Sequence, residues 1–203
     1  MSQPSQQDAD EDKAWVVIQT PLRIEELRSF CSRLENLYRI NPYLEFRQWR
    51  QTAPEQIHIE LRNHSNNRDV ADEFVLERES ENVFRVRYRD GLKRHTEFRL
   101  EPHAEGSRLT ITDDYGGLAS AKRQGREEEV DKSLNAWGHA LHLFFRRWKR
   151  WSWIAPWRWY MQRVWMPMKP SSRRIVWMLY LITVVEFFFF LFVLAIYLIE
   201  HRR

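Results

Sequence analysis

An uninterrupted apolar run from Ile175 to Ile199 is the feature of this sequence that most constrains its fold. The run contains 25 residues, with Glu186 as its only charged residue. As an α-helix it would extend roughly 37 Å, enough to cross a hydrocarbon core of about 30 Å. We therefore predict one transmembrane helix over residues 175–199, followed by a short tail of residues 200–203.

The charge bias beside this run predicts its orientation. Residues 146–174 carry nine lysines and arginines and no acidic residue, whereas two arginines follow the run. Basic flanks stay on the cytoplasmic side of a membrane. Residues 1–13 are polar and acidic, unlike a signal peptide, and read as a disordered leader. We expect a single-pass protein of the bacterial inner membrane with its N-terminal domain in the cytoplasm.

Residues 148–174 are rich in tryptophan and arginine. Such rings favour the headgroup level of a bilayer, and interleaved basic groups attract anionic lipid at about 1 kcal/mol each. We interpret this segment as a membrane-interface belt. Its expected membrane contacts are Trp148, Trp151, Trp153, Trp157, Trp159 and Trp165. The belt is either an ordinary juxtamembrane anchor or a surface that holds the preceding domain against the bilayer for lipid exchange.

The same mixture of aromatic and basic residues suits the stacking of nucleic acid bases. The adjoining membrane span argues against a nucleic acid partner, so we expect membrane lipid there instead.

Residues 14–147 read as one α+β domain. The stretch Ala14–Pro21 predicts a strand, and apolar residues at helical spacing from Leu22 to about Tyr38 predict a helix. After Tyr43 the apolar residues alternate with charged ones, which is typical of an antiparallel sheet with one wet face. Asp90-Gly91 is the strongest hairpin signal between these runs. With six strands after the helix, we expect about seven in total.

A second helical stripe runs from Arg126 to about Trp148 and predicts a long helix at the end of the domain. It enters the tryptophan-rich segment without a glycine- or serine-rich spacer, so we expect a stiff connection.

This order of strand, helix, six-strand meander and long C-terminal helix resembles the SRPBCC or START-like superfamily of polyketide cyclase-like and coenzyme Q-binding-like proteins. The likeness lies in Trp15–Thr20, the helix ending at Asn41-Pro42, the alternating runs and the stripe from Val130 to Phe145. It implies a helix-grip fold, in which a curved antiparallel sheet wraps around the C-terminal helix. It also implies a cavity that receives a hydrophobic ligand, and the added anchor favours a lipid, a quinone or a polycyclic molecule.

If the sheet grips the last helix, its apolar face and the facing helix residues form the expected ligand site. The expected ligand-binding residues are Ile59, Leu61, Phe84, Val86, Tyr88, Thr96, Phe98, Asp113, Trp137 and Leu141. The polar members are the more informative, because buried polar groups need partners. They either hydrogen-bond a ligand or cap the sheet near strand ends.

Catalytic patterns are few. Asp113 with Tyr115 offers a carboxylate near a phenol, which suits general acid or base chemistry in a cyclase-like enzyme. His139 and His142 have a spacing that can share a metal, but no third ligand is evident, so we expect no metal and no cofactor. Cys31 is expected to be a small buried residue.

Three hypotheses follow: a membrane-anchored module that binds a hydrophobic small molecule, a cyclase- or dehydratase-like enzyme, and a membrane-tethered adaptor for a protein partner. Glu186, in the middle of the span, adds an expected helix–helix contact, because a carboxyl group facing lipid is unfavourable.

Overall fold

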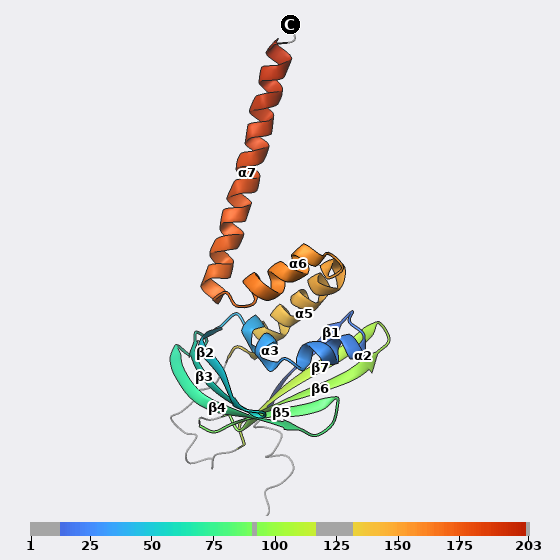
Figure 1. The fold of residues 1–203 in the computed structure, drawn as a ribbon, viewed down its shortest axis with the longest axis vertical. Helices are drawn as coiled ribbons and strands as arrows, with labels where there is room; N and C mark the ends of the chain where they lie inside the picture. Colours follow the sequence, from blue (N-terminus) through green and yellow to red (C-terminus); the bar gives the residue numbers. More distant parts are fainter. Residues whose placement is uncertain (1–12, 91–92, 117–131, 202–203) are drawn as a thin grey trace, which may run out of the picture. The chain divides into compact units, whose positions relative to one another are not determined.

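The computed structural model describes residues 13–90, 93–116 and 132–201, and divides the chain into two compact units after Pro167. We call the described part of the first unit the head. Its sheet has seven antiparallel strands in the order β1-β7-β6-β5-β4-β3-β2 (Figure 1). The strands are β1 (Lys13–Thr20), β2 (Leu44–Ala53), β3 (Gln56–Asn63), β4 (Arg68–Arg78), β5 (Val83–Tyr88), β6 (His95–His103) and β7 (Gly106–Asp114).

The predicted fold class is confirmed. Along each strand, side chains point alternately to the buried face and to the more exposed face of the sheet. In β3, Ile57, Ile59 and Leu61 are buried while His58, Glu60 and Arg62 are not. The outer face is crossed by ion pairs between neighbouring strands, such as Arg85 with Glu97 at 2.8 Å. This alternation fixes the register, because a slip of one residue would turn every apolar side chain toward water.

The predicted single helix after β1 is wrong in one respect, because two short helices occupy the segment: α2 (Ile24–Cys31) and α3 (Leu34–Ile40). The backbone leaves helical geometry at Arg33, with φ −97° and ψ 85°. The break lets Phe30 of α2 contact Phe144 and Phe145, while Tyr38 of α3 packs on Trp137.

The long gripping helix is α5 (Leu134–Trp151), which packs its buried stripe against the sheet. It begins later than expected from Arg126, after a turn at residues 132–133, and residues 126–131 lie outside the described part. It also continues three residues beyond Trp148. Gly138 permits close approach to β1, since a Cβ there would lie 2.5 Å from Cγ2 of Val16.

After α5 the chain turns back in α6 (Ala155–Tyr160) and the π-helix η2 (Met161–Trp165). These residues pack onto α5: Trp165 stacks on Phe144 at 5.9 Å, and Trp157 lies 5.7 Å from Trp148 between ring centroids. Met161 and Met166 are buried. Residues 148–167, which the sequence suggested as a separate segment, thus belong to the same compact unit as the sheet.

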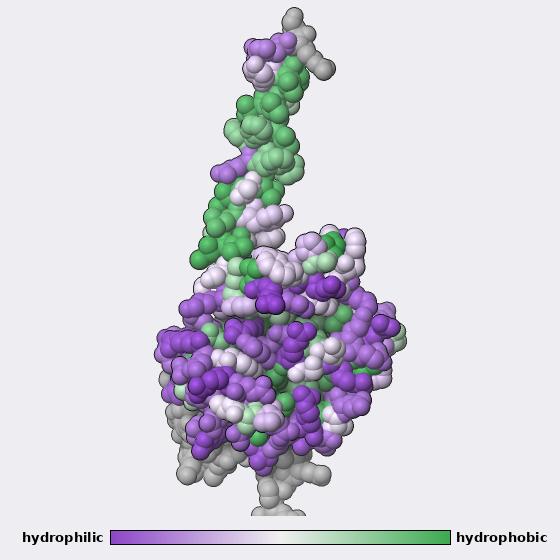
Figure 2. Space-filling model, viewed as in Figure 1, coloured by the Kyte–Doolittle hydropathy of each residue, from purple (hydrophilic) through white to green (hydrophobic). Residues whose placement is uncertain are grey.

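The second unit contains α7 (Pro170–His201), 32 residues with a mean hydropathy of 2.7 in its most apolar stretch. Within the described residues it is the helix long and apolar enough to cross a membrane. Figure 2 shows apolar residues along most of its surface, whereas the visible face of the head is mainly hydrophilic.

Candidate functional site

A cavity of about 320 Å³ lies between the sheet, α3 and the first turns of α5. Its inner end is mainly apolar, formed by Tyr38, Leu44, Ile59, Leu61, Phe74, Val70 and Trp137. The rings pack closely: the centroid of Tyr38 lies 5.0 Å from Trp137 and 5.2 Å from Phe74. Trp137 is fixed further by its indole N–H, which donates to the carbonyl of Leu37 at 2.9 Å.

A chain of polar side chains runs from this aromatic end into the sheet. The hydroxyls of Tyr38 and Tyr88 lie 2.7 Å apart, and the Tyr88 hydroxyl lies 2.8 Å from that of Thr96. Thr96 donates to Oδ1 of Asp113 at 2.5 Å. Since adjacent strands bring Tyr88, Thr96 and Asp113 together, the antiparallel pairing of β5, β6 and β7 builds this chain.

Lys93 ends the polar chain. Its Nζ lies 2.7 Å from Oδ2 of the almost fully buried Asp113, although that oxygen lacks a partner in hydrogen-bond geometry. We take the contact as an ion pair, because the separation is short and the charges are opposite. The same ammonium lies 5.6 Å from the ring centroid of Tyr88 and 5.9 Å from that of Tyr115, within cation–π range.

Burial, reinforced by neighbouring Tyr88, raises the pKa of Tyr38 well above its ordinary value. Tyr38 therefore stays protonated at neutral pH and supplies a hydroxyl that can donate or accept a hydrogen bond.

The mouth of the cavity is polar and lies between the β3–β4 turn and the chain that joins β5 to β6. Asp72 holds this region together, because its Oδ1 accepts backbone N–H groups from Glu73, Arg89 and Asp90 at 2.7 to 3.2 Å. Burial raises the pKa of Asp72, and those three hydrogen bonds oppose the rise.

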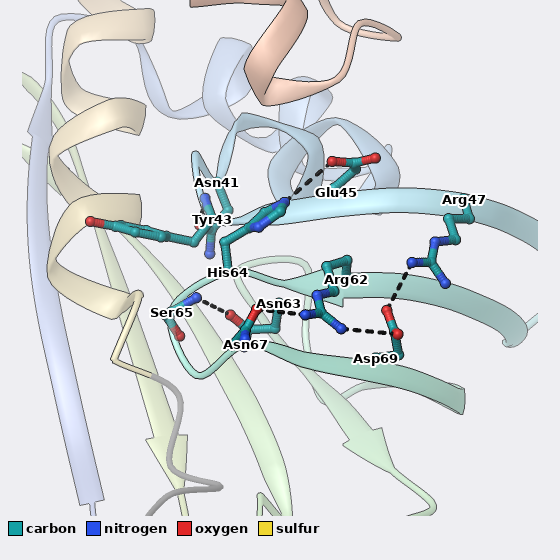
Figure 3. A network of polar contacts seen from close by, with 10 residues as sticks. All are labelled: Asn41, Tyr43, Glu45, Arg47, Arg62, Asn63, His64, Ser65, Asn67 and Asp69. Carbon is teal, nitrogen blue, oxygen red and sulfur yellow. Dashed lines mark hydrogen bonds and ion pairs between the residues drawn. The ribbon is translucent and has the colours of Figure 1, made fainter.

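The β3–β4 side of the mouth is tied to the beginning of α5. Asn41 donates from Nδ2 to Oγ of Ser133 at 2.8 Å, and the Lys132 N–H donates to Oγ of Ser65 at 3.3 Å. Figure 3 shows Arg62 of β3 held by Asn67 and Asp69. These contacts give the mouth a defined shape.

The structure places the expected site residues in four different surroundings. Ile59, Leu61, Tyr88 and Trp137 line the cavity, as does Tyr115, which follows the end of β7. Thr96 and Asp113 lie behind Tyr88 in the polar chain. Val86, Phe98 and Leu141 are packed in the core, and Phe84 lines a different hollow beside α2. Asp113 is thus placed to position Tyr88 through Thr96.

Sequence reasoning missed much of the mouth. The sequence patterns place Tyr38 in a helix and Asp90 in a hairpin turn without linking either to the cavity, and they do not single out Asp72 or Lys93. Asp72 carried a usable signal, because it stands in phase with Phe74 and Leu76 on the buried face of β4. Among the described residues no group of three potential metal ligands occurs.

The head resembles solved structures of low sequence identity. The Zhui aromatase/cyclase from Streptomyces sp. R1128 aligns with a TM-score of 0.54 and 12% identity, covering 69% of this chain and 96% of that chain. The chain has the START-like helix-grip fold. Protein Ms6760 from Mycobacterium smegmatis gives a TM-score of 0.50 with 11% identity, covering 69% of this chain and 94% of that one.

A START superfamily protein from Mycobacterium smegmatis gives a TM-score of 0.49 with 14% identity, covering 66% of this chain and 96% of that chain. No family model matches the sequence, and a search of curated proteins finds no significant match. The two structures with TM-scores of 0.54 and 0.50 support the helix-grip fold, and the chemistry of the site has to be argued from its own residues.

Proposed function

We propose that this protein is a membrane-anchored module that binds a compact hydrophobic small molecule in the helix-grip cavity. The observation that supports this proposal is the combination of an aromatic inner end with a linked set of hydroxyl, carboxylate and ammonium groups on one wall. A pocket of this kind buries an apolar body and orients it through a few polar contacts.

The size of the cavity narrows the ligand class. Small-molecule sites span about 300 to 1,000 Å³, and the volume of about 320 Å³ is at the lower end. A quinone head or a small polycyclic molecule suits that space, whereas a lipid with two long acyl chains exceeds it. The Tyr88 hydroxyl and the Lys93 ammonium are placed to contact a carbonyl, hydroxyl or carboxylate on such a ligand.

The anchor is part of the same proposal. α7 would cross the membrane once, with the head in the cytoplasm, as the basic residues before the span favour. Three of the expected interface tryptophans support a membrane-facing surface on the head, since Trp151, Trp153 and Trp159 are 41%, 78% and 62% exposed. Trp148, Trp157 and Trp165 pack against the core and would contribute by holding that surface in shape.

Ligand capture by the full chain tests the proposal. The chain would be purified in detergent, and its bound small molecules extracted and identified by mass spectrometry. Val70→Trp fills the cavity, whereas Val75→Trp is a matched control on the same strand, with its side chain on the opposite face. We expect Val70→Trp to lose the molecule and Val75→Trp to retain it. Equal recovery from both variants, or none from the unsubstituted chain, would contradict the proposal.

A cyclase-like enzyme is the second candidate, supported by the fold shared with an aromatase/cyclase and by the Tyr88–Thr96–Asp113 chain. In this alternative the Tyr88 hydroxyl would exchange a proton with the substrate, and Asp113 would position it through Thr96. The molecule captured by Tyr88→Phe should then be the substrate, and incubation with the unsubstituted chain should convert it to a product that differs in chromatographic retention and, where water is lost, in mass. Recovery of an unchanged molecule from both the unsubstituted chain and Tyr88→Phe would contradict the enzyme hypothesis and support the binding module.

A further inference from the structure

The cavity mouth and the exposed tryptophans occupy opposite ends of α5. Asn41, which lines the cavity, contacts Ser133, and Ser65 of the β3–β4 turn contacts Lys132, immediately before the helix. Within α5, Trp137 in the first turn lines the cavity. Since α5 contains 18 residues, its two ends are roughly 27 Å apart at about 1.5 Å per residue.

The other end of α5 carries a surface suited to lipid headgroups. We call it the Trp–Arg surface and define it as Arg147, Arg150, Trp151, Trp153, Arg158 and Trp159, all of which are exposed. The Arg150 guanidinium lies 5.5 Å from the ring centroid of Trp151. Exposed indoles combined with guanidinium groups bind at the level of anionic headgroups.

The Trp–Arg surface belongs to the same compact unit as the sheet. The head is held rigidly there by internal contacts: Lys149 pairs with Glu26 of α2 at 2.9 Å, and the Phe144, Trp148, Trp157 and Trp165 rings pack together.

We infer that the cavity opens to the aqueous phase, at the end of the head remote from the membrane surface, and that its ligand is exchanged with water or with a soluble protein. This inference rests on the proposed function. In this arrangement the ligand is an amphiphile that enters the cavity from water, and it does not enter laterally from the bilayer. The polar mouth, which includes Asp72, Asp90, Lys93 and Arg68, agrees with passage of a solvated polar group.

Fluorescence quenching of single-cysteine variants of the full chain in lipid nanodiscs tests this geometry. Cys31 is the only cysteine and is 3% exposed, so the unsubstituted chain gives the labelling background. Bimane would be attached at the mouth in Ala71→Cys and, separately, Asp90→Cys, and at the Trp–Arg surface in Trp153→Cys. One quencher is a nitroxide on the lipid headgroup, and the other is a water-soluble nickel chelate.

We expect the nickel chelate to quench both mouth labels strongly and the lipid nitroxide to leave them at least about fivefold less quenched than the label at position 153. Two mouth positions guard against one variant that fails to fold. Lipid quenching of the mouth labels equal to that at position 153 would overturn the inference, as would a label at 153 untouched by lipid. Neither result would affect capture of the ligand in Val75→Trp, so the two proposals fail separately.

Discussion

The hydroxyl oxygens of Tyr38 and Tyr88 lie 2.7 Å apart, joining α3 to β5 at the wall of the cavity. Tyr38 is 3% exposed, while Tyr88 also contacts Thr96 and stands over the Lys93 ammonium. The pair therefore connects the helical layer to the polar chain inside the sheet, and a ligand at Tyr88 would act on both.

Removing the hydroxyl of Tyr88 should destabilise the head more than removing the hydroxyl of Tyr38. Tyr88→Phe takes away the hydroxyl bonded to buried Tyr38, so we expect unfolding to be about 1–3 kcal/mol easier. Tyr38→Phe leaves Tyr88 bonded to Thr96, and we expect a loss nearer 1 kcal/mol. Unfolding of the purified chain in detergent measures both. The double variant should cost less than the sum of the single ones, and strict additivity would show that the hydroxyls are not coupled.

The same burial predicts a pH dependence at the alkaline end. The pKa of Tyr38 is raised well above its ordinary value by burial and by nearby Tyr88. In the unfolded chain the phenol ionises near pH 10, whereas in the folded chain it keeps its proton. The unfolded state then binds fewer protons, so stability should be complete below about pH 10 and fall as the pH rises above it. Tyr38→Phe should fall less steeply between about pH 10 and 11, measured as the unfolding midpoint in alkaline buffers.

Asp72 should act mainly as an acceptor for the backbone of the mouth. Asp72→Asn keeps an oxygen that can accept the N–H groups of Glu73, Arg89 and Asp90, whereas Asp72→Ala removes it. We expect Asp72→Ala to lose about 1–3 kcal/mol of stability and Asp72→Asn clearly less. Amide hydrogen exchange at Arg89 and Asp90 should accelerate in the alanine variant only. Equal acceleration of amide exchange in both variants would show that Asp72 stabilises the mouth through its negative charge and not as a hydrogen-bond acceptor.

Gly138 should resist a change that normally favours helices. Alanine is better than glycine by about 1 kcal/mol inside a helix, but the new Cβ would lie 2.5 Å from Cγ2 of Val16. We expect Gly138→Ala to lower stability by about 1–3 kcal/mol through overpacking. Val16→Ala removes the clashing methyl groups, so the double variant should recover part of that loss in a thermal unfolding experiment. A Gly138→Ala variant more stable than the original chain would contradict the close packing of α5 on β1.

The strands of the sheet could be predicted from the sequence because the pattern that marks a strand lies within the strand itself. In each strand the alternation of apolar and polar residues marks the buried face, as Ile57, Ile59 and Leu61 do in β3. Asp90-Gly91 predicts a hairpin between β5 and β6, and these strands pair, although Gly91 lies outside the described residues. The break at Arg33 has no such signal, since the apolar spacing continues through it from α2 into α3.

The cavity was harder to predict because it depends on residues from distant segments. Tyr38, Tyr88 and Trp137 meet only after α3, β5 and α5 are placed together. The tryptophans show the same limit: composition alone treats Trp153 and Trp165 alike, yet one is exposed and the other stacks on Phe144. Which indoles face outward is decided by the turn between α5 and α6.

Glu186 should promote association of α7 with a second copy of this chain. The carboxyl group lies near the middle of the apolar run, with Thr183 one helical turn before it, and the Thr183 hydroxyl donates to the Leu179 carbonyl. A carboxyl group in lipid gains most from another polar group, which a symmetry-related helix supplies as its own Glu186. We propose that two copies pair through this residue.

Glu186→Leu and Glu186→Gln separate a polar contact from apolar packing. Because glutamine retains a donor and an acceptor, we expect it to preserve association of the full chain in nanodisc or detergent. Leucine should reduce the association constant by about threefold to tenfold, a loss of roughly 0.6–1.4 kcal/mol that matches interhelical hydrogen bonds. Dilution-dependent energy transfer between donor- and acceptor-labelled chains measures this constant. A leucine variant that associates as strongly as the original would assign any pairing to the apolar face of α7.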